Sequence, residues 1–149
     1  MLLATLCSVV LLFVTVLIHY EVLRITSSLI SRLTIPPRPR LLVVIFAVFL
    51  AHTLEIWIYA LGYYLLSHDF GMGRLGQFGG MFGYHFRDFL YFSTITYTSL
   101  GLGDVYPLGD LRLIAGSEAL TGLLMIGWSA SFTYLAMEKF WYLHSKRRD

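Results

Sequence analysis

The stretch at residues 96–104 reads Thr-Tyr-Thr-Ser-Leu-Gly-Leu-Gly-Asp, and its spacing suits a backbone that binds a dehydrated cation. Such a site needs several carbonyl oxygens that point toward one axis, which requires dihedral angles of alternating sign along the chain. Because positive φ is inexpensive only at glycine, Gly101 and Gly103 supply it at alternate positions. The Ser99 hydroxyl adds an oxygen ligand at the inner end. Since these oxygens would replace the hydration shell of an ion, the stretch predicts a cation filter.

The composition indicates that this filter lies in a membrane. Of the 149 residues, 57% are hydrophobic and 13% are charged, whereas soluble domains are about 45–50% apolar and about 25% charged. The composition disfavours a soluble globular enzyme and excludes a disordered chain. The lone Cys7 rules out a disulfide framework and a cysteine-rich zinc site. The formal net charge of +2 is too small to argue for nucleic acid as a partner.

Three apolar stretches approach the length of about 20 residues that a helix needs to cross a bilayer. They are residues 2–18 (extended by His19 and Tyr20), residues 41–66 and residues 111–137. The first lacks the basic start and the Ala-x-Ala site of a signal peptide, so we interpret it as a retained helix. Residues 84–97 are aromatic but too short to span, which predicts a re-entrant helix. The C-terminal end of that helix directs its partial negative charge at the filter.

We therefore expect an all-α membrane protein with three transmembrane helices, a re-entrant pore helix and a selectivity-filter loop. The expected division is an extra N-terminal helix with a cytoplasmic Pro/Arg loop (1–40), a pore domain (41–137) and a short basic cytoplasmic tail (138–149). Within the pore domain we expect an outer helix (41–66), a Gly-rich extracellular loop (67–83), a pore helix (84–97), a filter (98–104) and an inner helix (111–137). The loop at residues 31–40 is predicted from its three prolines and three arginines, which interrupt a membrane helix.

The placement of lysine and arginine predicts the orientation in the cell membrane. Eight basic residues flank the first loop and the C-terminus, whereas three follow the Gly-rich loop or lie within it. The first loop and the C-terminus are therefore expected in the cytoplasm. Three spans then place the N-terminus outside, and the pore helix enters from the outside.

The filter stretch resembles that of potassium channels, whose signature is Thr-Val-Gly-Tyr-Gly followed by Asp. Residues 99–104 occupy those six positions in order as Ser-Leu-Gly-Leu-Gly-Asp. Other positions match the aromatic pair of the pore helix, its threonines, and an arginine and a glycine of the inner helix; they are Tyr91, Phe92, Thr96, Thr98, Arg112 and Gly122. The resemblance covers about residues 41–139 and is closest to the two-transmembrane "ion channel" type of bacterial pore. The second pore loop of two-pore-domain potassium channels is also similar.

This resemblance implies passive K⁺ conduction, no enzymatic activity and no cofactor beyond the permeant ion. One filter strand cannot surround an ion but four can, so we expect a homotetramer in the lipid bilayer. The expected ion-binding residues are Ser99, Leu100, Gly101, Leu102 and Gly103, supported by Thr98, Asp104, Tyr91 and Phe92.

Two departures from the family pattern concern the rigidity of the filter. Leu102 stands where the family has a tyrosine that hydrogen-bonds to an aromatic cuff, and Phe92 lacks the indole N–H often found at its position. A weakly selective monovalent cation channel is therefore a second hypothesis. A non-conducting accessory subunit of a larger channel is a third.

Several residues within the spans need an explanation of their own. His52 and Glu55 share a helix face. We interpret them as a neutral Glu55 or as a hydrogen-bonded pair that holds this helix to the pore helix or the N-terminal helix, with a proton-sensing or ion-relay pair as the alternative. An intramembrane enzyme built on this pair lacks further metal ligands, because His19 and Glu21 are poorly placed to complete a site. From the resemblance, Glu118 is expected to bond to hydroxyls of the pore helix, such as those of Thr94 or Thr96. Gly122 is expected to be a gating hinge, with close helix packing as its alternative.

Overall fold

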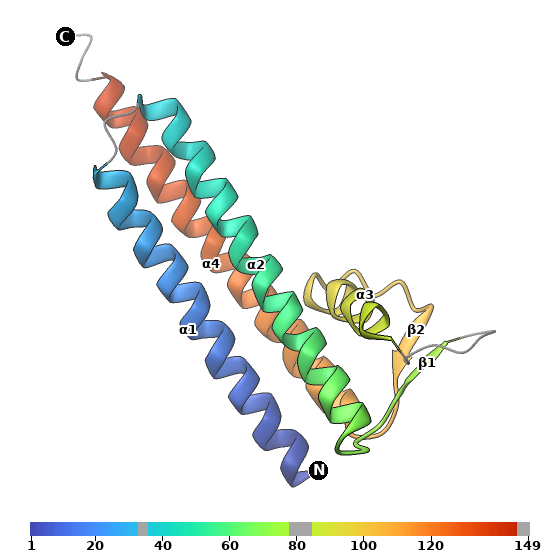
Figure 1. The fold of residues 1–149 in the computed structure, drawn as a ribbon. Helices are drawn as coiled ribbons and strands as arrows, with labels where there is room; N and C mark the ends of the chain where they lie inside the picture. Colours follow the sequence, from blue (N-terminus) through green and yellow to red (C-terminus); the bar gives the residue numbers. More distant parts are fainter. Residues whose placement is uncertain (33–35, 78–84, 146–149) are drawn as a thin grey trace.

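The computed structural model describes residues 1–32, 36–77 and 85–145 (Figure 1). These residues form four helices and two short strands. The elements are α1 (Leu2–Arg32), α2 (Pro37–His68), β1 (Leu75–Gln77), α3 (Phe86–Tyr97), β2 (Val105–Pro107) and α4 (Leu111–Ser145). Parts of four predicted segments lie outside the described residues: 33–35 of the first loop, 78–83 of the Gly-rich loop, residue 84 of the pore helix, and 146–149 of the tail.

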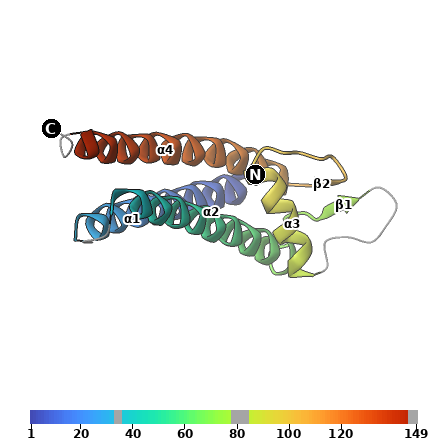
Figure 2. The same ribbon diagram turned by 90° about the horizontal axis from the view of Figure 1, so that it is seen from above.

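The prediction of three membrane spans is confirmed. Three helices are long and apolar enough to cross a bilayer, namely Leu2–Arg32, Pro39–His68 and Leu111–Lys139. They run side by side, with α2 antiparallel to both α1 and α4, whereas the short α3 lies against one end of the bundle (Figures 1 and 2). The chain is therefore an integral membrane protein with one non-spanning helix between its second and third spans.

The first loop is shorter than predicted, because both flanking helices extend into it. α1 continues to Arg32, since residues 21–32 contain neither proline nor glycine and Arg24 pairs with Glu21 at 2.6 Å. α2 begins at Pro37, where the missing N–H costs nothing because the first turn of a helix has no partner for it. The prolines thus begin a helix here and do not prevent one. α4 likewise runs on to Ser145, eight residues beyond its predicted end.

The Gly-rich loop contains a strand that the sequence did not predict. β1 pairs antiparallel with β2, with Leu75 opposite Pro107 and Gln77 opposite Val105. The strands stand beside the filter-bearing end of the bundle (Figure 1). This two-stranded sheet joins the segment before α3 to the segment that follows residues 98–104.

The core lies where α2, α3, α4 and the two-stranded sheet meet. It consists of large apolar and aromatic side chains: Tyr59, Tyr63, Leu66, Leu75, Phe89, Phe92, Val105, Leu111 and Ile114. By contrast, the outer faces of the long helices expose leucine, valine and phenylalanine, such as Phe46 and Phe49. Exposed apolar side chains on spanning helices are suited to lipid or to further protein subunits. The core therefore fixes α3, and with it the filter, at one end of the bundle.

Candidate ion-conduction site

The predicted filter, residues 98–104 (the filter below), has the alternation of dihedral signs that a row of carbonyl ligands requires. φ is +55° at Ser99, +51° at Gly101 and +79° at Gly103, and it is not positive at Leu100 or Leu102. Ser99 adopts this left-handed conformation without being a glycine, which costs about 1–2 kcal/mol. Residues of alternating handedness turn successive carbonyls toward the same side, so this stretch can present a row of oxygens to one ion path.

The last turn of α3 holds the start of the filter. The N–H of Ser99 donates to the carbonyl of Thr96 at 2.9 Å, and the N–H of Gly101 donates to the carbonyl of Ile95 at 3.2 Å. The Thr98 hydroxyl donates to the carbonyl of Thr94 at 2.7 Å. These bonds place the filter directly after the C-terminal end of a helix, where the partial negative charge favours a cation.

A second contact supports the outer end of the filter. The hydroxyl of Tyr91, on α3, donates to Oδ2 of Asp104 at 2.7 Å. This hydrogen bond raises the pKa of the Tyr91 phenol, because the carboxylate of Asp104 accepts the hydrogen bond of the neutral phenol. Phe92 instead points into the core, where its ring meets that of Tyr63 edge-on at 5.1 Å. Tyr91, and not Phe92, is therefore the aromatic residue that hydrogen-bonds to Asp104.

In a single chain the filter is open on one side. Leu100 is 62% exposed and Leu102 is 60% exposed, so neither side chain packs into the core of its own chain. Within one chain Leu102 is therefore not packed in the core that holds Phe92, which is 3% exposed. The exposed face of the filter is available to an ion path and to further subunits.

Glu118 supports α3 from α4, but through different partners from those expected. The Tyr63 hydroxyl donates to its Oε2 at 2.5 Å, and the Ser93 hydroxyl lies 2.5 Å from its Oε1. The expected partner Thr94 instead donates to the carbonyl of Leu90. The reason is helical phase: Ser93 is fully buried against α4, whereas Thr94 is exposed. The expected bond to a hydroxyl of the short helix is therefore present at Ser93, whereas Thr94 and Thr96, the two examples named for it, are not the partners.

The C-terminal end of α3 contacts α4 at Gly122. A Cβ atom at Gly122 would lie 2.0 Å from the carbonyl oxygen of Tyr97 and 2.9 Å from its carbonyl carbon. By comparison, a Cβ at Gly127 would meet nothing within 4 Å. Glycine at 122 is thus explained by close packing of backbone against backbone, which was the alternative to a hinge.

A buried polar cluster joins all four helices beside the end of α3. Oε1 of Glu55 lies 2.8 Å from Nδ1 of His19, and Oε2 accepts a hydrogen bond from the Tyr97 hydroxyl. Nδ1 of His52 lies 2.8 Å from the same hydroxyl, and Nε2 of His19 lies 3.1 Å from Oγ of Ser129. Glu55 therefore bonds to α1 and α3, as the structural interpretation of the pair requires.

The expectation that His19 is poorly placed is wrong. His19 lies beside Glu55 because α1 packs against both α2 and α4, a pairing that no spacing along the sequence reveals. Both side chains are fully buried. Tyr97 and Ser129 were also missed as members of this cluster, since each looks like an ordinary residue of an apolar helix. Glu21 pairs with Arg24 on the surface of α1 and takes no part.

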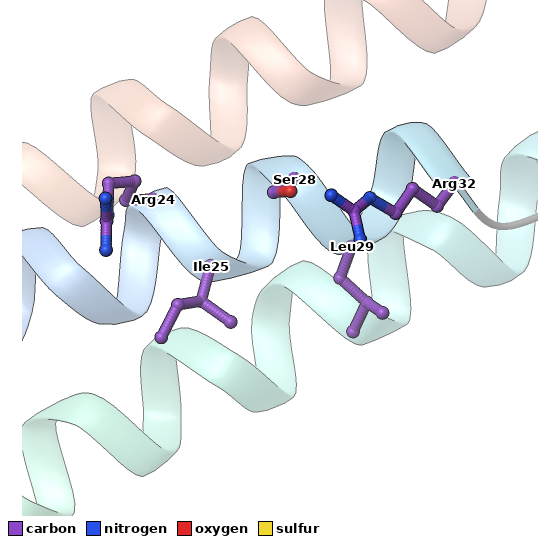
Figure 3. Close-up of a pocket in the computed structure, with 5 residues that line it drawn as sticks. All are labelled: Arg24, Ile25, Ser28, Leu29 and Arg32. Carbon is purple, nitrogen blue, oxygen red and sulfur yellow. The ribbon is translucent and has the colours of Figure 1, made fainter.

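The opposite end of α1 carries a basic surface. A pocket of about 420 Å³ is lined by Arg24, Ile25, Ser28, Leu29 and Arg32, whose positions along α1 Figure 3 shows. Arg24, Ser28 and Arg32 are four residues apart and share one helix face. This end of α1 lies away from α3 and the filter (Figure 1). Arginine at this end is compatible with the phosphate-rich surface of a membrane.

Comparison with known proteins identifies the pore region. The family model described as ion channel (Ion_trans_2) matches residues 41–139. No curated protein and no solved structure matches the chain. The match covers most of α2, both strands, α3, residues 98–104 and most of α4, but not α1. With two thirds of its residues matched and the filter geometry described above, the chain belongs to the ion channel family and not to a family of enzymes.

Proposed function

We propose that the protein is a potassium channel that conducts K⁺ passively through a filter formed by four copies of residues 99–103. The ligands are the backbone carbonyls of Ser99, Leu100, Gly101 and Leu102, with the Ser99 hydroxyl at the inner end. The observation that carries this proposal is the alternation of positive φ at Ser99, Gly101 and Gly103. A filter built of backbone carbonyls discriminates by replacing the hydration shell of one ion better than that of another.

The tetramer and the orientation belong to the same proposal. The exposed filter of one chain supports assembly around an axis, because an ion must be surrounded on all sides. The basic face of Arg24 and Arg32 supports a cytoplasmic end for α1, so that the N-terminus and the filter exit lie outside.

Potassium flux into liposomes tests conduction. Purified protein is reconstituted alone, and Gly101→Ala is compared with Gly71→Ala. Both glycines have similar positive φ, +51° and +58°, and an added Cβ meets nothing within 4 Å at either position. The backbone strain is therefore matched, and only Gly101 lies in the filter. We expect Gly101→Ala to abolish most of the flux and Gly71→Ala to retain it.

The outcomes separate this proposal from its rivals. Equal flux from both variants would mean that the filter is assigned to the wrong residues. No flux from the wild-type protein would favour an accessory subunit. Reversal potentials under opposed K⁺ and Na⁺ gradients then measure selectivity; equal permeability would replace the potassium channel with a weakly selective cation channel. The observation that favours this second candidate is the exposed, hydroxyl-free side chain of Leu102.

A further inference from the structure

The three groups His19, His52 and Glu55 form a compact set of metal-ligating side chains. One ligand atom of each lies within 4.8 Å of the others, and His19 and Glu55 are fully buried. We propose that these three residues bind a divalent transition metal ion, for which Zn²⁺ is the best fit, inside each chain. The site is separate from the filter, and α1, which supplies His19, lies outside the matched residues 41–139.

The donor set selects the class of ion. Two imidazole nitrogens and one carboxylate are a set that Zn²⁺ binds with three protein ligands, whereas Mg²⁺, Ca²⁺ and K⁺ prefer oxygen. A fourth donor is at hand: the Tyr97 hydroxyl contacts Glu55 and lies 2.8 Å from Nδ1 of His52. Four donors from three helices suit tetrahedral coordination. Ligand atoms around Zn²⁺ stand roughly 3.3 Å apart for bonds of about 2.0–2.1 Å. The donor pairs now at 2.8 Å therefore move apart by about 0.5 Å to admit the ion, and the widest pairs, which lie within 4.8 Å, draw together by up to about 1.5 Å.

The outer contacts of His19 suit a metal ligand. A ligating imidazole usually gives its second N–H to an oxygen, which fixes the tautomer and the ring orientation. Oγ of Ser129 lies 3.1 Å from Nε2 of His19 and can accept that hydrogen bond. Nδ1 of His19 is then left facing Glu55, 2.8 Å from Oε1, where metal binding replaces a shared proton. His19 and Ser129 are 110 residues apart in the sequence, so the packing of α1 on α4 brings them together.

A cavity provides access to the cluster. It has a volume of about 430 Å³, lies between α2, α3 and α4, and has His52 and Tyr97 in its wall together with Thr94 and Thr98. The His52 side chain is 18% exposed, whereas those of His19 and Glu55 are completely covered. An ion can therefore reach His52 and Tyr97 first, without the helices separating.

Cobalt(II) absorption tests the site without any measurement of ion flux. The full-length protein in detergent is stripped with EDTA and titrated with Co²⁺, whose tetrahedral complexes absorb strongly in the visible range. We expect about one Co²⁺ per chain, displaced by Zn²⁺, in line with a site of three to four protein ligands. His52→Gln should weaken binding by at least about tenfold, since even outer-shell changes weaken metal sites by that amount.

His68→Gln is the matched control. His68 is the last residue of α2 and contacts Tyr64, outside the cluster, so its variant should bind Co²⁺ as the wild type does. His52→Gln is the decisive variant. Because His52 is the only partly exposed side chain of the three proposed ligands, its replacement disturbs the packing least. Thermal unfolding in the absence of metal checks that the variant folds.

Three results would overturn the proposal: no tetrahedral Co²⁺ band in the wild type, unchanged affinity in His52→Gln, or an equal loss in His68→Gln. The first would leave the cluster as a set of hydrogen bonds between helices. Because the readout is spectroscopic, failure here is distinct from failure of potassium conduction.

Discussion

At the residue scale, Ser93 is the clearest test of how α3 is held. Its hydroxyl lies 2.5 Å from Oε1 of Glu118 and 2.9 Å from the carbonyl oxygen of Ile56, and it is fully buried. Ser93→Ala removes a hydroxyl between three helices and leaves Oε1 of Glu118 without that partner. A buried polar group deprived of its partner costs about 1–3 kcal/mol, so we expect the apparent melting temperature to fall by about 3–10 °C.

Ser131→Ala is the control for this change. Its hydroxyl bonds to the carbonyl of Gly127 within α4 and is exposed. The same substitution there should leave the melting temperature within a degree or two, as for most surface changes (about 0.5 kcal/mol or less). Equal melting temperatures for the two variants would show that the bond between Ser93 and Glu118 contributes nothing to stability.

At the element scale, the contact between α3 and α4 predicts an asymmetry between two glycines of α4. Gly122→Ala would place a Cβ atom 2.0 Å from the Tyr97 carbonyl oxygen, so one helix must shift. Overpacking of this kind typically costs about 1–3 kcal/mol. Gly127→Ala meets nothing within 4 Å, and alanine there gains about 0.5–1 kcal/mol over glycine in a helix.

Thermal unfolding and flux together separate packing from hinge motion. We expect Gly122→Ala to lower the melting temperature and reduce K⁺ flux, because Tyr97 directly precedes the filter residues. Gly127→Ala should raise or keep the melting temperature. If Gly122→Ala melts no lower than Gly127→Ala while its flux changes, the close-packing explanation is wrong and a hinge role is favoured.

The elements also show how far the sequence alone predicts this structure. Hydropathy and length predict the three spans. The filter motif likewise predicts a short helix before it and a spanning helix after it. Both signals are local in the sequence. The starts and ends of the helices were predicted less accurately. Pro37 begins a helix at a place where the prolines suggested a loop. The two-stranded sheet of β1 and β2 was missed because its strands have three residues each and are separated by the whole of α3.

The candidate site divides in the same way. The positive φ at Gly101 and Gly103 follows from residue type and spacing, whereas that at Ser99 does not follow from residue type. The partner of Glu118 depends on which face of α3 is buried, and the neighbour of Glu55 depends on how α1 packs. Such contacts between distant segments are decided by tertiary packing, and a single sequence without periodic polar signals does not reveal them.

At the scale of the whole molecule, α1 is a structural part of the pore unit although the family match begins at residue 41. Its His19 is fully buried and contacts both Glu55 of α2 and Ser129 of α4. Glu55 in turn accepts from Tyr97 at the end of α3. The extra helix is thereby linked to the residue that precedes the filter by two hydrogen-bonded steps, and not merely attached to the lipid-facing side.

The proposed tetramer makes a quantitative prediction for mixed assemblies. When wild-type chains and Gly101→Ala chains are co-expressed in equal amounts, a tetramer contains only wild-type chains in about one sixteenth of cases, a dimer in about one quarter and a monomer in about one half. One strained filter strand disrupts the whole ring of carbonyls, so K⁺ flux per chain should fall to about 6% of the wild-type value in the tetrameric case. Co-expression with Gly71→Ala, which has the same backbone strain outside the filter, should leave flux unchanged. Flux that remains near one half at equal expression would mean that each chain conducts independently, and the tetramer would have to be abandoned.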